Sequence, residues 1–259
     1  ITIYIGGLNV FEGSVTPGNI AEFVMYITML TWPVSAIGWC ASIIQQAEAS
    51  QKRINEFLSL QPDINDSKSI QSLSSALDIE FKDLNFTYPE NQVQALHHLN
   101  VIIPEGEHVA IVGHTGSGKS TIAELILRMY DPTSGSISIG NIELDQLKIN
   151  VLRNSIAYVP QDVFLFSDSI LENILLGAKS KDLPLEEIEN FCKMACIHDE
   201  IIKFPNGYNT QIGERGVSLS GGQKQRLSIA RALIKSAKIL ILDNCLSAVD
   251  TETEVKILK

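Results

Sequence analysis

Basic residues are absent from the first 51 positions of the chain, and the 22 residues from Phe23 to Ile44 carry no charge of either sign. As a helix this segment would extend about 33 Å, which matches a hydrocarbon core of about 30 Å. A buried soluble helix containing Pro33 is the alternative, but core helices rarely run so far without a charged side chain. The sequence therefore predicts a full membrane helix at about residues 17–50.

The first basic residues, Lys52 and Arg53, come together just after the apolar segment. By the positive-inside tendency the C-terminal side is cytoplasmic. Residues 1–11 are apolar but too short to span, and they lack the basic start and cleavage site of a signal peptide. We expect a partial helix there, joined to the next by an external turn. Residues 1–60 are thus predicted to be the C-terminal end of a transmembrane domain in a multi-pass protein of the cell (inner) membrane.

Clustered positive charge is also lacking, since the chain has ten more acidic than basic side chains. Phosphate contacts along a nucleic acid need clustered Lys and Arg, so a nucleic-acid partner is excluded.

Cysteine is scarce as well, and four cysteines suit a reducing compartment better than a disulfide scaffold. Cys192, Cys196 and His198 allow a zinc interpretation, but without a second ligand pair they are more often small buried residues.

Residues 61–77 are rich in Ser, Asp and Asn, and this composition predicts a linker. Beyond it, residues 78–259 alternate β-rich segments with helical patterns, which is typical of an α/β domain with a largely parallel sheet. The predicted organisation is a membrane segment, a linker and a cytoplasmic α/β domain.

A glycine-rich motif, "GHTGSGKS", follows a predicted strand at residues 108–112 and precedes a helix starting near Lys119. It fits G-x-x-x-x-G-K-[ST], in which backbone N–H groups and the helix N-terminus surround an anion. Lys119 supplies a positive charge for the β- and γ-phosphates, and the Ser120 hydroxyl can ligate Mg²⁺. The residues expected to contact ATP are Gly113, His114, Thr115, Gly116, Ser117, Gly118, Lys119, Ser120 and Thr121.

A second element of the same site is the apolar run "KILILD", predicted to be a fully buried parallel strand. It places Asp243 at the C-terminal edge of the sheet, where its carboxylate can hold Mg²⁺. An apolar run followed by Asp is a weak signal by itself. Together with the glycine-rich motif it indicates nucleoside triphosphate binding.

Between these two elements lies "LSGGQKQR", in which Ser220 is a good N-cap and two glycines expose the backbone at a helix N-terminus. With a second anion site in this position, the chain resembles the ATP-binding cassette (ABC) transporter family. The order of its parts is similar to that of an exporter half-transporter of the bacterial lipid-flippase and multidrug type. The resemblance covers the whole chain and implies a P-loop NTPase domain with a mixed sheet and a helical subdomain.

The resemblance also implies roles for individual residues. Tyr88 in "FTYPE" matches the aromatic that stacks on adenine, and Gln161 in "YVPQD" matches the loop glutamine that contacts Mg²⁺. A signature motif would close over the γ-phosphate of the opposite subunit's ATP, so hydrolysis requires a dimer. The residues of this signature are Ser220, Gly221, Gly222 and Gln223. Two further matched segments are the exporter-specific loop at Gly213, Glu214 and Arg215, and the interface loop at Ser247, Ala248 and Asp250.

Asn244 stands where the family usually has a glutamate that polarises the attacking water. An amide orients water but takes no proton at neutral pH, which removes roughly 10²- to 10⁴-fold of rate. The catalytic residues expected from the resemblance are therefore Asn244, Gln161 and Lys119, at a site that binds ATP and Mg²⁺ but hydrolyses slowly. The Mg²⁺ ligands expected are Ser120, Gln161 and Asp243.

The intact signature beside Asn244 favours a heterodimer with a second half-transporter, although a homodimer or an altered natural sequence remains open. The chain stops at Lys259, before the position where the resemblance places the family's switch histidine. Two rival functions are a soluble cassette ATPase, which the predicted membrane helix argues against, and a regulatory ATP-binding subunit, which Asn244 alone supports. The transported substrate is not predicted.

Overall fold

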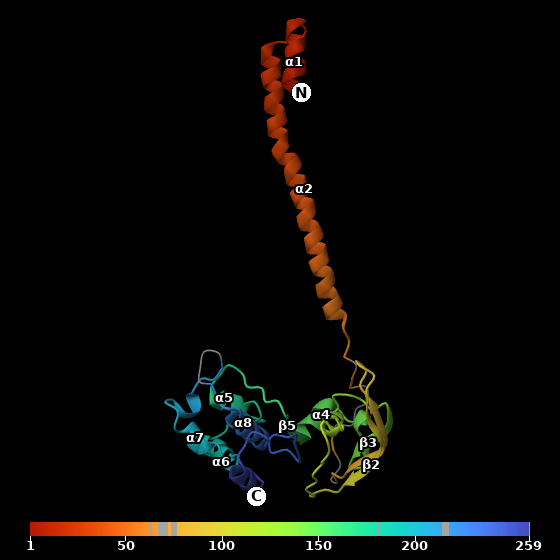
Figure 1. The fold of residues 1–259 in the computed structure, drawn as a ribbon, viewed down its shortest axis with the longest axis vertical. Coiled ribbons are helices and arrows are strands. Elements are labelled where there is room, and N and C mark those ends of the chain that lie inside the picture. Colours follow the sequence, from red (N-terminus) through yellow and green to blue (C-terminus); the bar gives the residue numbers. More distant parts are fainter. Residues whose placement is uncertain (63, 67–71, 74–76, 181, 214–217, 259) are drawn as a thin grey trace. The chain divides into compact units, whose positions relative to one another are not determined.

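A computed structural model of the chain describes residues 1–62, 64–66, 72–73, 77–180, 182–213 and 218–258. The chain divides into two compact units, Ile1–Asp63 and Ile64–Lys259. The first consists of helices α1 (Thr2–Phe11) and α2 (Pro17–Ser59), which pack side by side near their connecting turn (Figure 1). Helix α2 begins at Pro17 because Thr16 and Asn19 form a capping box around the first turn.

Helix α2 contains the predicted membrane helix and continues past it, to Ser59 rather than to about residue 50. Among the described residues it is the one helix long and apolar enough to cross a membrane. None of its residues is buried, and Trp32 and Trp39 are 78% and 69% exposed. A long helix with large apolar side chains on its surface fits a lipid environment.

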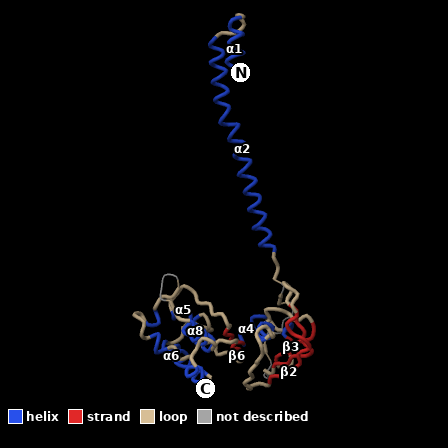
Figure 2. Tube along the Cα trace, in the orientation of Figure 1, coloured by secondary structure: helices blue, strands red, loops and turns tan. Residues whose placement is uncertain are grey.

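The second unit contains an antiparallel sheet in the order β2-β1-β3-β4 and a parallel pair, β5-β6 (Figure 2). The antiparallel sheet is formed by β1 (Ile79–Thr87), β2 (Gln94–Ile103), β3 (Ser134–Ile139) and β4 (Ile142–Glu143). Helices α3 (Lys119–Ile126) and α4 (Ile149–Ser155) follow, with the short helix η1 (Leu144–Gln146). The remaining elements are β5 (Ile156–Val159), α5 (Ile170–Leu175), α6 (Leu185–Met194), α7 (His198–Ile201), η2 (Gly207–Asn209), α8 (Gly221–Leu233), β6 (Ile239–Leu242) and α9 (Thr251–Ile257).

Strand β1 contains an irregularity that keeps one face in the core along its length. Ile79 and Phe81 point inward, the register shifts before Leu84, and Leu84 and Phe86 then point inward too. Without the extra residue the second pair would face solvent, because side chains alternate along a strand. The same alternation carries the next inward position to Tyr88, just after the strand ends.

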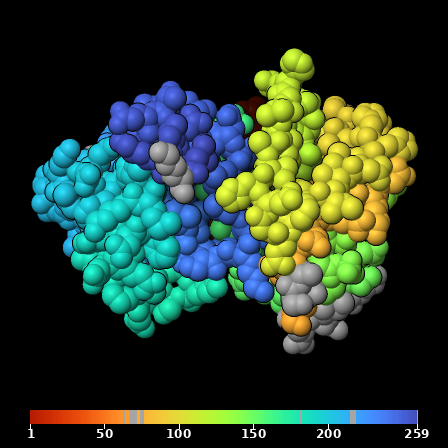
Figure 3. Space-filling view, turned by 90° about the horizontal axis from the view of Figure 1, so that it is seen from below, coloured from red at the N-terminus to blue at the C-terminus, as the bar shows by residue number. Residues whose placement is uncertain are grey.

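The described residues of this unit form two hydrophobic cores. The sheet core is formed by β1, β2 and β3 with α3 and α4, and the helical core by α5, α6 and α8 with their connections. Strand β5 joins them, since Ile156 packs in the sheet core while Ala157 and Val159 pack in the helical core. In the space-filling view, the segments coloured yellow to green and those coloured cyan to blue occupy different sides of the face shown (Figure 3).

The structure corrects three expectations about strands. Residues 108–112 form no strand, and Val109, Ile111 and Val112 are 49%, 47% and 88% exposed. A β-rich sequence becomes a strand only when a neighbouring strand takes up its backbone hydrogen bonds, and no ladder includes this segment. For the same reason the parallel part of the fold is confined, in the described residues, to β5 and β6. Strand β6 is half-buried rather than fully buried, with Leu240 46% exposed.

Candidate nucleotide-binding site

The glycine-rich motif forms a curled loop that ends where α3 begins, as expected. Gly118 has a φ of +86° at the N-cap position, and a Cβ there would lie 2.7 Å from the carbonyl oxygen of Ala95 in β2. The loop therefore packs directly on β2, and only glycine fits at this point. Within the loop the Lys119 ammonium donates to the carbonyl oxygens of Gly113 and His114, over 3.0 and 2.7 Å. Its charge is held inside the loop, where a phosphate would meet it.

Tyr88, the aromatic residue expected to stack on the adenine base, lies beside the helix that follows this loop. The Tyr88 hydroxyl is 2.8 Å from Thr121 Oγ1 and 2.8 Å from Glu124 Oε2, both on α3. Its ring meets Phe86 and Tyr130 edge-on, with centroids 4.9 and 5.5 Å apart. Burial is the main cause that raises the pKa of Tyr88, so its hydroxyl keeps its proton and donates to the Glu124 carboxylate. Tyr88 thus belongs to the same cluster as the phosphate-loop helix.

The parallel pairing of β5 and β6 brings two predicted Mg²⁺ ligands to one sheet edge. Val159 pairs with Leu242, so the segments after both strands leave the sheet on the same side. Asp243 follows β6 directly and its N–H donates to the Val159 carbonyl oxygen over 2.9 Å. Gln161 lies two residues past β5 and is exposed. Their amide and carboxylate oxygens suit a hard cation such as Mg²⁺.

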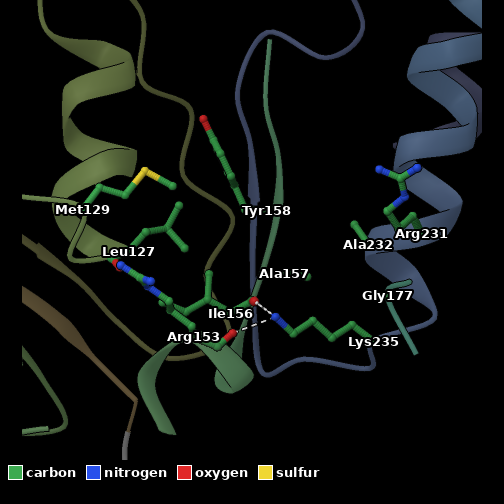
Figure 4. A pocket seen from close by; sticks show the side chains of 10 residues that line it. All are labelled: Leu127, Met129, Arg153, Ile156, Ala157, Tyr158, Gly177, Arg231, Ala232 and Lys235. Carbon is green, nitrogen blue, oxygen red and sulfur yellow. Dashed lines mark hydrogen bonds between the residues drawn. The ribbon is translucent and has the colours of Figure 1, made fainter. Parts of the chain in front are cut away.

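Tyr158 is a neighbour of Asp243 that the sequence did not single out. Its hydroxyl donates to Asp243 Oδ2 over 3.4 Å, and burial, followed by the charge of Asp243, raises its pKa to about 12. The residue also borders a cavity of about 420 Å³ between α3 and α8, where Lys235 donates to the carbonyl oxygens of Arg153 and Ile156 (Figure 4). The neutral Tyr158 hydroxyl holds the Asp243 carboxylate by a hydrogen bond and leaves its negative charge available to a cation.

Asn244 adopts a left-handed backbone conformation, with φ +48°, and its side chain is exposed. Its carbonyl oxygen accepts a hydrogen bond from Ser247 N–H over 3.4 Å, which begins the turn of the following loop. Asparagine tolerates this conformation better than most residues. The backbone at this point therefore fits the amide residue that the sequence contains.

The signature segment opens α8 with a capping box. Ser220 Oγ accepts from Gln223 N–H over 3.2 Å, and Gln223 Oε1 accepts from Ser220 N–H over 2.9 Å. The amide nitrogen of Gln223 then donates to Glu200 Oε2 over 2.8 Å, and Glu200 also binds Arg226 through its other oxygen. Both ends of the Gln223 side chain are thus occupied within this chain, leaving the backbone N–H groups of Gly221 and Gly222 for an anion.

A buried glutamine connects the signature helix with the interface loop. Gln225 Nε2 donates to Ser247 Oγ over 3.2 Å, and Gln225 Oε1 accepts from Ala248 N–H over 3.0 Å. A Cβ on Gly222 would lie 2.7 Å from the Ala248 carbonyl oxygen, so the two segments are in close contact. Asp250, at the end of this loop, caps α9, and the Thr253 N–H lowers the pKa of its carboxyl.

The exporter-specific loop is described only in part, because Glu214 and Arg215 lie outside the described residues. Just before Gly213, Ile212 N–H donates to the Asp168 carbonyl oxygen over 3.0 Å. The loop therefore starts beside the segment that follows Gln161. Cys192, considered above for zinc, is buried, and burial raises the pKa of its thiol to about 11, which suits a small core residue.

The predicted site residues fall into separate groups. Within the described part of the chain, no hydrogen bond or ion pair joins Lys119 or Ser120 to Asp243. Four further residues join the site only through the fold: Glu124, Tyr158, Glu200 and Gln225. Each is a polar side chain that contacts a segment distant in sequence, and no local pattern marks such a contact.

Residues 96–247, more than half of the chain, match the family described as "ABC transporter". The chain belongs to this family. It is similar, at 42% identity over 98% of its length, to the "Multidrug resistance-like ATP-binding protein MdlA" of Escherichia coli, of which it covers 42%. It is equally similar, at 42% identity over 99% of its length, to the "ATP-dependent lipid A-core flippase" of Desulfotalea psychrophila, of which it covers 44%.

A solved structure supports the assignment to ABC transporters. A bacterial Atm1-family ABC exporter with ATP bound superposes with a TM-score of 0.78 at 35% identity, over 95% of this chain and 42% of that one. The α/β cassette preceded by a long apolar helix is thus confirmed as the fold. The chain spans somewhat less than half the length of the relatives it matches.

Proposed function

We propose that the chain is part of a half-subunit of an ATP-driven exporter in the cell membrane, with its cassette in the cytoplasm. The observation that carries this proposal is the presence of two anion sites on one chain, the Lys119 loop and the capped N-terminus of α8. Paired head to tail, two such cassettes would each hold ATP between one subunit's loop and the other's signature. Helix α2, apolar and unburied, supports a membrane protein over a soluble cassette ATPase.

The donors in this chain fit ATP and Mg²⁺. Lys119 and the loop N–H groups would bind the phosphates, and Tyr88 would stack on adenine. Oxygen donors from Ser120, Gln161 and Asp243 would hold Mg²⁺, which, when bound, offsets charge on the β- and γ-phosphates. Asp243 is supported by Tyr158, so its carboxylate has a fixed partner when the ion is absent.

Asn244 makes this chain's own site slow. Its amide orients water but accepts no proton, and the left-handed backbone at this position supports an asparagine rather than a longer acid. The signature, in contrast, is complete and firmly capped. We therefore propose a heterodimer in which this chain's signature completes a faster site on a glutamate-bearing partner. A purely regulatory ATP-binding subunit is the second candidate, and Asn244 is the observation that favours it.

The names of the relatives concern multidrug resistance and lipid A. These names support an amphipathic, membrane-soluble substrate for this exporter.

The first experiment measures phosphate release from the full-length subunit in lipid, with the variants Asn244→Glu and Asn244→Gln. Glutamine has the length of glutamate without its basicity, so it separates base catalysis from reach. We expect Asn244→Glu to raise the rate at least tenfold and Asn244→Gln to leave it near the starting value. A Lys119→Ala variant gives the background. Equal rates for the unaltered protein and Asn244→Glu, both well above an inactive Lys119→Ala variant, would contradict the proposed effect of Asn244 and favour a self-sufficient homodimer.

A further inference from the structure

The Tyr88 hydroxyl connects the end of β1 to the phosphate-loop helix, 33 residues away from Thr121 in sequence. Its proton goes to the Glu124 carboxylate, which only accepts, and Thr121 therefore donates to the Tyr88 oxygen. Thr121 and Glu124 are three positions apart and share one face of α3. The aromatic side chain is thus attached at two points to the helix that begins at Lys119.

The ring of Tyr88 is restrained from the side as well. Phe86 and Tyr130 contact it at interplanar angles of 77° and 85°, with ring centroids 4.9 and 5.5 Å from its own. These contacts limit movement of the ring. The hydrogen bonds to α3 hold its far end, and together they fix the ring against the helix that carries the phosphate loop.

We propose that Glu124 is a positioning residue for the base of the nucleotide. It holds Tyr88 in the orientation that stacks on adenine, at a fixed distance from the phosphates bound by the Lys119 loop. Glu124 acts through Tyr88 and does not touch the nucleotide. This inference rests on the proposed function, in which Tyr88 is the adenine platform, and it adds the residue that sets the spacing between base and phosphates.

If Glu124 acted only through its charge, its removal would have the opposite effect on ATP affinity. The Glu124 carboxylate repels bound phosphates, so removing its charge alone would tighten the binding of any polyphosphate. Loss of positioning would instead weaken only a ligand that has a base. Inorganic tripolyphosphate, which carries the phosphates without the base, therefore separates the two effects.

The experiment measures the affinity of the full-length protein in lipid for Mg-ATP and for Mg-tripolyphosphate by calorimetry. We expect Glu124→Ala to weaken Mg-ATP about five- to tenfold, the loss typical of one or two hydrogen bonds. Tripolyphosphate should bind equally well or more tightly. Glu124→Gln keeps an acceptor for the Tyr88 hydroxyl and should retain ATP affinity within about twofold. Glu107→Ala, at an exposed carboxylate near the loop, is the charge-matched control.

Tyr88→Phe tests whether the effect passes through the hydroxyl, since it keeps the ring and removes the hydrogen bond. The double variant Tyr88→Phe/Glu124→Ala should bind ATP no more weakly than Tyr88→Phe alone. Three outcomes would each overturn the positioning role of Glu124 without refuting the nucleotide site. They are equal weakening of ATP and tripolyphosphate binding, additive losses of ATP affinity in the double variant, and unchanged ATP affinity in Glu124→Ala. If the unaltered protein binds neither ligand, the nucleotide site itself is refuted.

Discussion

Two backbone conformations set which residues this nucleotide site accepts. Gly118 and Asn244 both have positive φ, at +86° and +48°, yet their surroundings differ. Gly118 lies against the backbone of β2, so it has no room for a side chain. Asn244 is exposed, and its conformation restricts residue type only through the preference for asparagine at left-handed positions. Packing against β2 restricts the residue type at Gly118, whereas the local backbone conformation restricts it at Asn244.

Replacing Gly118 by alanine should damage both the loop and ATP binding. The added Cβ would lie 2.7 Å from the Ala95 carbonyl oxygen, so the loop must move off β2. Gly106 is a matched control, because its φ of +81° imposes the same strain while nothing lies within 4 Å. We expect Gly106→Ala to cost about 1 kcal/mol and Gly118→Ala more. Thermal unfolding with and without Mg-ATP measures this, and equal effects would contradict the packing argument.

The buried cysteines should react slowly with alkylating reagents. Burial raises the pKa of Cys192 and of Cys245 to about 11, so at pH 8 about one molecule in a thousand carries a thiolate there. Cys196, which is partly exposed, should be modified first outside the membrane helix. Mass spectrometry of the maleimide-treated native protein gives the order. Labelling of both buried thiols should accelerate about tenfold per pH unit between pH 7 and 9. Labelling of Cys192 before Cys196 would disprove the expected order.

At the scale of elements, α8 forms contacts on two sides. Its first turn is held by Glu200 from α7 and by the loop after β6 through Gln225. The amide of Gln225 is buried and both of its ends are satisfied, so the pair of hydrogen bonds links the signature helix to the Asn244 loop. The signature helix and this loop are thereby joined directly.

Gln225→Ala should loosen this link and lower stability. The change removes the hydrogen bonds to the Ala248 N–H and the Ser247 hydroxyl, and because both residues are exposed to water we expect a cost of about 0.5–1.5 kcal/mol. Lys224→Ala, at the exposed neighbouring position, should change the unfolding free energy by less than about 0.5 kcal/mol. Hydrogen exchange of the amides of residues 247–249 reports the link directly. If these amides exchange equally fast in both variants, Gln225 does not hold the loop.

Local patterns predicted the elements whose signals are local. The apolar run predicted α2, the capping residue Ser220 marked the start of α8, and the glycine-rich motif marked the start of α3. Residues 108–112 have equally strong β propensity and form no strand, because pairing depends on a neighbour that sequence alone does not supply. Glu124 and Gln225 escaped prediction for a related reason: their partners are set by the tertiary fold.

At the scale of the whole molecule, mutations in the two proposed anion sites of this chain should have unequal effects on ATP hydrolysis if the protein is a heterodimer. Under the proposed function, Lys119 would bind this chain's own ATP, whereas Ser220 would contact the ATP bound to the partner. If the own site is slow and the partner's site is fast, most hydrolysis depends on Ser220. In a homodimer the two residues would matter equally.

This asymmetry is measurable on the complex purified from its native membrane. We expect a bulky cation at the signature, Ser220→Arg, to abolish most phosphate release, and Lys119→Ala in the same chain to spare much of it. The cap of α8 is lost in Ser220→Arg, at about 1 kcal/mol, so Ser220→Thr, which keeps a capping hydroxyl, is the control for folding. Equal loss of hydrolysis in the Lys119→Ala and Ser220→Arg complexes would favour the homodimer.

Helix α2, with 43 residues, is about 65 Å long, while a bilayer core takes up about 30 Å. If residues 23–44 span the core as proposed, the 15 residues from 45 to 59 extend about 22 Å beyond it on the cassette side. Such an extension is a lever arm. A tilt of about 10° within the span would displace its far end by roughly 4 Å, which is most of a helical turn. Modest rocking in the membrane would then become a shift approaching one helical turn at the end where the cassette is attached.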